Sequence, residues 1–264
     1  MKNILSVGGL FICLLFALTS AGQDNSLFLK REFKDKKGSL LPYRILYPDN
    51  YDKKKKYPLV LFLHGRGECG IDNEKQLIHG SKQFLSNENR KNFPTIVLFP
   101  QCTEAGYWGS VKIDRTTTPT VFDFNYDRPI TDQLAGVIEL VKKISKEESV
   151  DKKRVYVTGL SMGGMGTFEA VYRYPKLFAA ALPICGGGDT QHYDKRVTKI
   201  PFWIFHGSVD GAVNVKYSRE MVDKLKSIGV SVKYTEYPGV NHDSWNNAFA
   251  EPDYLNWMFS QRKK

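Results

Sequence analysis

Hydrophobic residues in this chain gather in short unbroken runs that alternate with longer stretches of helical periodicity. Residues 59–63 read Leu-Val-Leu-Phe-Leu and residues 96–99 read Ile-Val-Leu-Phe. Unbroken apolar runs of this length are typical of parallel strands that are covered on both faces. Further strand-like runs occupy residues 154–158, 178–184, 202–205 and 230–237. The pattern predicts a largely buried parallel sheet.

The stretches between these runs carry apolar residues at helical spacing. We expect helices over residues 131–146, 161–174, 217–227 and 245–259, with Thr131 as the cap of the first. Near the start, residues 27–33 and 43–47 flank a turn-like segment and predict an antiparallel hairpin. Strands that alternate with helices predict an α/β fold with three layers and a mostly parallel sheet.

Length and composition indicate a single domain over residues 23–264. The chain has 264 residues, 42% of them hydrophobic, with no low-complexity linker and no repeat. Residues 1–22 predict a signal peptide: Lys2 is followed by an apolar run over residues 4–18 and then by small residues. The alternative is a membrane anchor, but the run is short for a bilayer span and contains Gly8 and Gly9. We therefore expect a secreted or periplasmic protein without stable membrane insertion.

Charge and cysteine content narrow the function classes. The net charge of +10 comes mainly from scattered lysines, without the aromatic-interleaved basic stripe of a nucleic-acid-binding protein. Neither HExxH nor CxxC spacing is present, so no metal site is expected. After the signal region only Cys69, Cys102 and Cys185 remain, which allows at most one disulfide, between Cys69 and Cys102 if geometry permits. The sequence does not indicate an oligomeric state.

The segment from Gly159 to Gly163 reads Gly-Leu-Ser-Met-Gly and lies between a strand-like run and a helical stretch. This context predicts a nucleophile elbow, in which Ser161 occupies a strained strand-to-helix turn and projects its hydroxyl over the sheet edge. An ordinary turn is the alternative, because GxSxG is a common pattern. The serine needs a base and an orienting carboxylate to become a nucleophile.

The base and the carboxylate are expected in loops that follow later strands. His242 lies in a turn-rich loop after residues 230–237, whereas His64 and His206 end apolar runs and fit structural roles. Asp210 follows the run that ends at His206, and its alternative role is turn formation in an Asp-Gly pair. Asp243 adjoins His242, and neighbours in sequence rarely orient their side chains to meet, so Asp210 is preferred. The order Ser161, Asp210, His242 is that of α/β-hydrolases.

Two backbone N–H groups are expected to bind the oxyanion that forms when the serine attacks a carbonyl. The elbow places the N–H of Met162 for this role. A second donor is expected at Arg66, within the glycine-flanked segment that follows residues 59–63. A tight turn is the alternative interpretation of that segment.

Taken together, these segments resemble the α/β-hydrolase superfamily over residues 40–260, specifically small secreted esterases of the feruloyl and acetylxylan esterase group and prolyl oligopeptidase-like hydrolases. The residues that carry the resemblance are the segments 63–68, 99–102 and 157–164 and the loops with Asp210 and His242. The resemblance implies Ser161 as nucleophile, His242 as base, Asp210 as its orienter and no cofactor. Arg66 replaces the middle glycine of the family's HGGG motif.

The expected function is serine-dependent hydrolysis of carboxylic esters, on small molecules or on acetyl or feruloyl groups of polysaccharides. A serine peptidase of the prolyl oligopeptidase-like type is the second reading, although no accessory propeller accompanies the hydrolase segment. An inactive binding protein on the same scaffold is the third. The long connection over residues 103–127 is rich in aromatic residues, so Trp108 in this connection and Trp245 beyond His242 are candidate substrate contacts.

Overall fold

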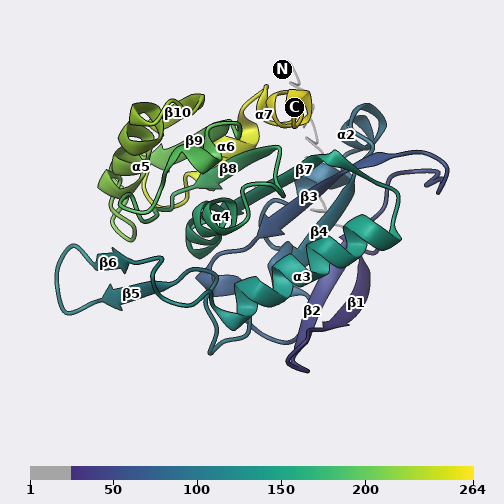
Figure 1. The fold of residues 1–264 in the computed structure, drawn as a ribbon, viewed down its shortest axis with the longest axis horizontal. Helices are drawn as coiled ribbons and strands as arrows, with labels where there is room; N and C mark the ends of the chain where they lie inside the picture. Colours follow the sequence, from purple (N-terminus) through teal and green to yellow (C-terminus); the bar gives the residue numbers. More distant parts are fainter. Residues whose placement is uncertain (1–24) are drawn as a thin grey trace, which may run out of the picture.

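A computed structural model describes residues 25–264, so the predicted signal peptide lies outside the described residues. Within this range the main sheet has eight strands in the order β1-β2-β4-β3-β7-β8-β9-β10 (Figure 1). Strand β2 is antiparallel to β1 and β4, and the other neighbours pair in parallel. The strands are β1 (Leu29–Lys34), β2 (Leu40–Leu46), β3 (Tyr57–Leu63), β4 (Ile96–Pro100), β7 (Val150–Leu160), β8 (Ala180–Ile184), β9 (Phe202–Gly207) and β10 (Val232–Tyr237).

The unbroken apolar runs arise because successive side chains of a strand point to opposite faces of the sheet. In β3, Leu59, Leu61 and Leu63 join one hydrophobic core, and Val60 and Phe62 join a second core on the other face. Both cores are covered by helices, so neither face of the strand meets water. The predicted three-layer α/β fold with an N-terminal antiparallel hairpin is therefore confirmed.

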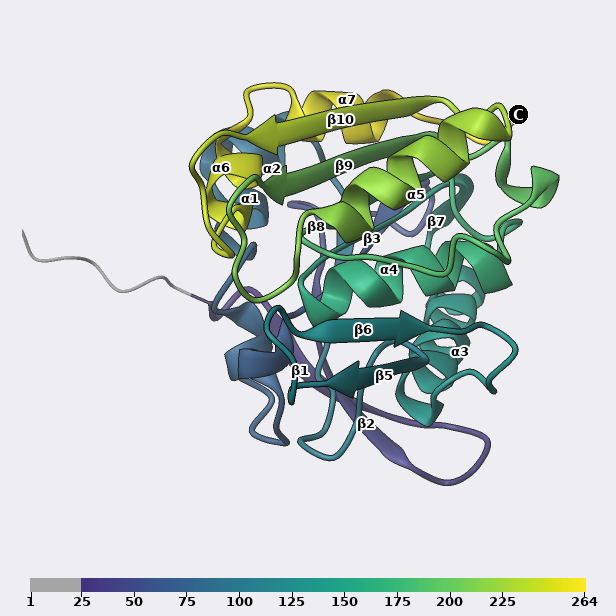
Figure 2. The same cartoon turned by 90° about the vertical axis from the view of Figure 1, so that its left-hand side faces the viewer.

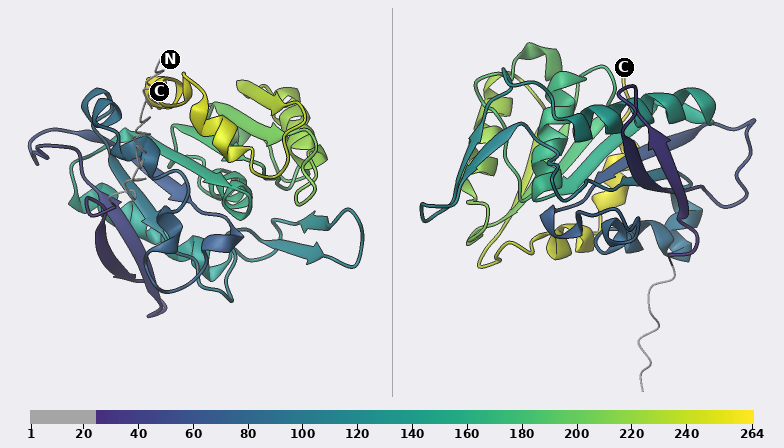
Figure 3. Two further views of the ribbon diagram at one scale, coloured as in Figure 1. Left: turned by 180° about the vertical axis from the view of Figure 1, so that it is seen from behind. Right: turned by 90° about the horizontal axis from the view of Figure 1, so that it is seen from below.

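Helices cover both faces of the sheet. One core includes residues of α3 (Asp132–Glu147), α4 (Met162–Arg173) and α5 (Lys216–Ser227), and α3 and α4 lie in front of the sheet in Figure 1. The other includes residues of α1 (Lys82–Leu85), α6 (Trp245–Ala250) and α7 (Tyr254–Ser260), and Figure 3 shows α6 and α7 from behind. No helix among residues 25–264 is long and apolar enough to cross a membrane.

Several elements differ from the sequence-based prediction. The helix expected over residues 245–259 is two helices, α6 and α7, because Pro252 cannot donate a helical hydrogen bond and disfavours helix in the residue before it. The segment after β3 folds into short helices that were not predicted: η1 (Arg66–Glu68), η2 (Lys75–Leu77), α1 and α2 (Asn87–Asn92), with η3 (Lys195–Val197) later in the chain. They are too brief to show a clear hydrophobic period.

The long connection over residues 103–127 contains a hairpin of β5 (Val111–Asp114) and β6 (Val121–Phe124). This hairpin projects from the body of the molecule (Figures 1 and 3). Its Phe122 and Phe124 pack against the ring of Tyr217 in α5, with centroids 5.7 and 5.6 Å away. The aromatic residues of this connection therefore serve largely to attach the hairpin to the rest of the fold.

Candidate active site

Ser161 occupies a sharp turn between β7 and α4. Its backbone has φ 54° and ψ −116°, a region that non-glycine residues rarely adopt. The turn is possible only because the residues two positions before and after Ser161 are glycines. A Cβ at Gly163 would lie 1.9 Å from the carbonyl oxygen of Leu63, and one at Gly159 would lie 2.5 Å from the carbonyl oxygen of Gly163. The predicted elbow geometry is thus present.

The structure brings Ser161, His242 and Asp210 together in one hydrogen-bonded chain. Ser161 Oγ lies 3.0 Å from His242 Nε2, and His242 Nδ1 lies 2.8 Å from Asp210 Oδ2. Asp210 follows β9 and His242 follows β10, and Figure 2 shows these two parallel strands ending side by side next to α6. The three side chains meet because parallel strands deliver their carboxyl ends to one edge of the sheet.

Asp210 is buried, and each of its oxygens is hydrogen-bonded. Oδ1 accepts from the backbone N–H groups of Ala212 and Val213 at 2.9 and 2.8 Å. Burial by itself would raise the pKa of Asp210, but hydrogen bonds from His206 and His242 outweigh it and hold the pKa well below its ordinary value. The carboxylate is therefore ionised at neutral pH, as a group that orients an imidazole must be.

His206 is a partner of Asp210 that sequence reasoning missed. Its position at the end of an apolar strand predicted a packed structural histidine, and it is indeed fully buried. However, its Nε2 lies 3.1 Å from Asp210 Oδ2 and 2.8 Å from the carbonyl oxygen of Val213. His206 is therefore a second histidine that helps to fix the carboxylate. The spacing of four residues from His206 to Asp210 across a glycine turn is the signal that could have indicated this.

The two predicted oxyanion donors each begin a helix. Met162 is the first residue of α4 and Arg66 is the first residue of η1. The first N–H groups of a helix have no acceptor within that helix, so neither group is used by its own helix and such positions commonly bind anions. The structure thus supplies two candidate amides near the elbow, from the segments the sequence indicated.

His64 holds the peptide group that precedes Arg66. The N–H of Cys102 donates to His64 Nε2 at 2.9 Å, so Nδ1 must carry the ring proton and donate to the carbonyl oxygen of Gly65 at 2.6 Å. Burial lowers the pKa of His64 to about 4, which keeps the ring in this neutral form. The prediction of a structural role for His64 is confirmed. Because the Gly65 carbonyl and the Arg66 N–H belong to one planar peptide, His64 also orients that N–H.

The Arg66 side chain is engaged away from the triad. Its guanidinium donates to the carbonyl oxygens of Glu104 and Gly106, the latter at 2.7 Å, and to Cys69 Sγ at 3.5 Å. These bonds attach the segment to the connection that follows β4. The expectation that only the backbone of Arg66 serves the site fits this arrangement.

The two tryptophans singled out from the sequence have different environments. Trp108 is fully buried, donates to the carbonyl oxygen of His64 at 3.1 Å and packs over Gly166. Because its side chain has no exposed surface, Trp108 is a core residue beneath the loop and not a substrate contact. The sequence could not show this, since aromatic residues line substrate sites and fill cores alike. Trp245 is partly buried, and its ring meets the ring of His242 edge-on at 5.4 Å. It therefore borders the triad.

The cysteines of the described residues are free and buried. Cys185, Asp210 and His242 offer potential metal-ligand atoms that lie within 4.8 Å of one another. However, a metal there would displace the bond between His242 and Asp210, and burial raises the pKa of the Cys185 thiol, which opposes formation of a thiolate ligand. The arrangement fits a hydrogen-bonded dyad beside a neutral thiol. Cys69 and Cys102, the pair that a disulfide could have joined, are free thiols.

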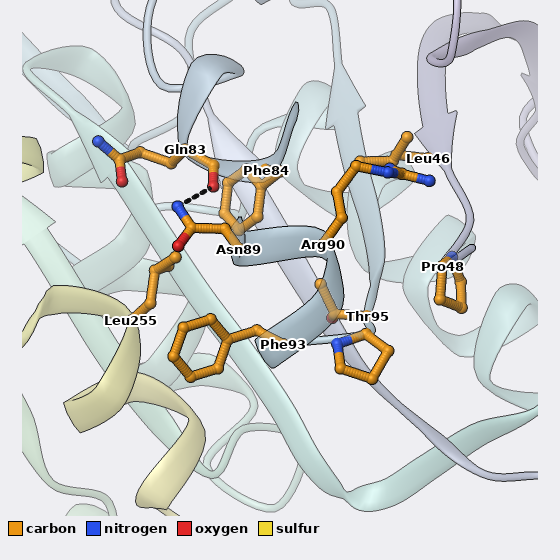
Figure 4. Close-up of a pocket in the computed structure, with 10 residues that line it drawn as sticks. Leu46, Pro48, Gln83, Phe84, Asn89, Arg90, Phe93, Thr95 and Leu255 are labelled. Atoms are coloured by element: carbon orange, nitrogen blue, oxygen red, sulfur yellow. Dashed lines mark hydrogen bonds between the residues drawn. The ribbon is translucent and has the colours of Figure 1, made fainter. Parts of the chain in front are cut away.

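Several hollows lie outside the triad among the described residues. The pocket in Figure 4 is lined by α1, α2 and residues such as Leu46 and Leu255, with Asn89 donating to the carbonyl of Gln83 at 2.8 Å. Its volume of about 10 Å³ holds no more than a water molecule. A larger hollow of about 510 Å³ lies between residues 103–111 and residues 128–133 and is lined in part by Tyr107, Arg128 and Gln133. Of these two, only the second is large enough for an organic ligand.

Comparisons with known proteins identify the family to which the chain belongs. Residues 50–252 match a family described as Phospholipase/Carboxylesterase. A carboxylesterase of Arabidopsis thaliana, SOBER1, is 26% identical over 216 residues, which cover 78% of this chain and 90% of that protein. A bifunctional acetylxylan esterase/xylanase of Neocallimastix patriciarum is 35% identical over 69% of this chain and 23% of its own. A solved thermostable esterase superposes with a TM-score of 0.81 at 38% identity, over 90% of this chain and 64% of that one.

Proposed function

Because the chain belongs to the phospholipase/carboxylesterase family of α/β-hydrolases, we propose that it is a serine carboxylic ester hydrolase that acts through an acyl-enzyme on Ser161. The hydrogen-bonded chain from Ser161 through His242 to Asp210 carries this proposal. A serine hydroxyl is a poor nucleophile until a base takes its proton, and the 3.0 Å contact with His242 provides that base. An inactive binding protein would have no need of this geometry.

The proposed reaction has two steps. His242 Nε2 accepts the proton as Ser161 Oγ attacks the ester carbonyl, and the N–H groups of Met162 and Arg66 stabilise the oxyanion. His242 then donates that proton to the departing alcohol. In the second step a water molecule, deprotonated by His242, attacks the acyl-enzyme. The bond to Ser161 Oγ then breaks, His242 returns the proton to Oγ, and the acid is released. Asp210 stabilises the imidazolium in both steps because it remains ionised.

We propose acetyl or feruloyl esters of polysaccharides as substrates, with small-molecule esters also accepted. The similarity to a bifunctional acetylxylan esterase/xylanase supports an acetyl group. Export to the periplasm or the medium, where such polymers are found, stays a prediction from residues 1–22.

Turnover of p-nitrophenyl acetate, methyl ferulate, acetylated xylan and a chromogenic peptide by wild-type and Ser161→Ala protein tests the proposal. We expect ester hydrolysis that falls by about 10³-fold or more in Ser161→Ala, because the nucleophile is lost. Equal rates in the two proteins would refute the mechanism. Peptide cleavage faster than ester cleavage would favour a serine peptidase.

A further inference from the structure

A row of aromatic and polar side chains leads away from His242 on the side where Trp245 lies. The ring of Trp245 meets His242 at 5.4 Å, and the ring of His79 lies against Trp245 at 5.1 Å. His79 Nε2 in turn lies 3.7 Å from Glu68 Oε1. The row therefore connects the catalytic imidazole with the last residue of η1.

Glu68 also lies close to the nucleophile elbow, through Gly65 and Leu160. A Cβ at Gly65 would lie 3.0 Å from Glu68 Oε2 and 2.7 Å from Leu160 Cδ1. The carboxyl group of Glu68 thus packs directly on the backbone of Gly65, beside the residue that precedes Ser161. The row of contacts therefore runs from Ser161 through His242, Trp245, His79 and Glu68 to Gly65, which packs against Leu160, the residue before Ser161.

The chemistry of Glu68 is unusual for a glutamate. Its residue exposure is 8%, and Oε2 has no hydrogen-bond partner among the described residues. Burial raises the pKa of Glu68, and the nearby His79 and the backbone N–H groups of Gly65 and Glu68 offset this only in part. A buried carboxyl whose burial is only partly compensated is costly, so such groups call for an explanation beyond stability.

We propose that Glu68 is a positioning residue that holds the oxyanion peptide of Gly65 and Arg66 in register with His242. It acts through its contact with Gly65 on one side and through His79 and Trp245 on the other. His64 holds the carbonyl oxygen of this peptide by a hydrogen bond, as described above, and Glu68 packs at the Cα of Gly65, so the two side chains restrain the same peptide from different sides. This inference rests on the proposed hydrolase function.

A group that only positions the oxyanion amide affects the transition state more than the bound ester. Its loss should therefore lower kcat and leave KM nearly constant. We expect Glu68→Ala to lower kcat for p-nitrophenyl acetate by about 10- to 100-fold, the effect of a small misplacement of a catalytic group, with KM within about threefold. Glu68→Gln keeps the shape and should restore kcat to within about fivefold of wild type. Trp245→Leu should also lower kcat, because it removes the ring that lies between His79 and His242.

The double variant Glu68→Ala/Trp245→Leu tests the connection itself. Residues that act through one network show non-additive effects, so the combined loss should be clearly smaller than the product of the two single losses. Glu74→Gln is the matched control, because this carboxylate lies in the same segment but is half-exposed and bonded to Arg44 and Lys30. It should leave kcat within about twofold.

Three results would overturn the inference: wild-type kcat in Glu68→Ala, a raised KM at constant kcat, or strictly multiplicative losses in the double variant. Thermal unfolding verifies that each variant is folded. If Glu68→Ala does not fold, His79→Ala takes its place in the single and double variants, because it removes the side chain between Glu68 and Trp245. Wild-type turnover in Ser161→Ala would instead refute the hydrolase proposal, so the two failures are distinguishable.

Discussion

At the scale of single residues, the partners of a side chain decide its role. His242 has a side chain that is 26% exposed and contacts both Ser161 and Asp210, which leaves it free to exchange a proton. His64 and His206 are buried and each is held through both ring nitrogens. In the sequence, His242 lies in a turn-rich loop, whereas His64 and His206 end apolar runs, and this difference separated the predicted base from the two structural histidines. It did not reveal that His206 also contacts Asp210.

The choice between the two neighbouring aspartates is testable at this scale. Asp210→Asn should lower kcat for p-nitrophenyl acetate by about 10³- to 10⁴-fold, because an amide no longer holds the required tautomer of His242. Asp243→Asn should retain kcat within about threefold, since the described contacts of the triad do not include its side chain. A greater loss in Asp243→Asn than in Asp210→Asn would contradict the assignment.

At the scale of elements, close backbone packing sets which glycines are required. The start of α4 passes so near the end of β3 that Gly163 has no room for a methyl group, whereas a Cβ on Gly67 in η1 would meet no atom of a more distant residue within 4 Å. Both are glycines of short motifs and look equivalent in the sequence. Only the crossing of α4 over β3 separates them, and that crossing is a tertiary feature.

Substitution by alanine at these two glycines should therefore have unequal effects. Gly163→Ala places Cβ 1.9 Å from the Leu63 carbonyl oxygen, so the elbow must shift. We expect a loss of at least about 2 kcal/mol in the free energy of unfolding and a large loss of kcat. Gly67→Ala should change that free energy by less than about 1 kcal/mol. Urea unfolding of both variants is the measurement, and similar losses would contradict the packing argument.

At the scale of the whole molecule, the sheet assembles the site from distant parts of the chain. Ser161 and His242 are 81 positions apart, yet their side chains meet because β7 and β10 end at the same edge. The buried His64 joins this edge to the loop after β4 through the N–H of Cys102. The fold therefore depends on a histidine that must remain neutral.

This dependence predicts how stability changes with pH. The pKa of His64 is about 4 in the folded protein and 6.5 in an unfolded chain, so between these values only the unfolded state binds the proton. The contribution of neutral His64 to the free energy of unfolding is fully present above pH 6.5. It is lost as the pH falls towards 4, by up to about 3 kcal/mol. Urea unfolding at pH 7, 5.5 and 4.5 measures it.

A substituted protein isolates the contribution of His64 to this slope. His64→Gln should be less stable at pH 7 but should show a flatter dependence between pH 6.5 and 4.5. His192→Gln is the control: burial lowers the pKa of His192, but bonds to Asp127 and Asp189 outweigh it and raise the pKa, so its contribution is lost above pH 6.5. An unchanged slope in His64→Gln would show that other groups dominate.

The sequence by itself determined the alternation of strands and helices, the elbow at Ser161 and the choice of Asp210 and His242 as its candidate partners. These follow from local periodicity and from short segments whose residue types are dictated by backbone geometry. Only the tertiary structure decided that Trp108 is buried, that His206 contacts Asp210 and that Glu68 packs on Gly65. Such features depend on which strand ends and loops become neighbours in space, and neighbours across the sheet leave no periodic signal in the chain.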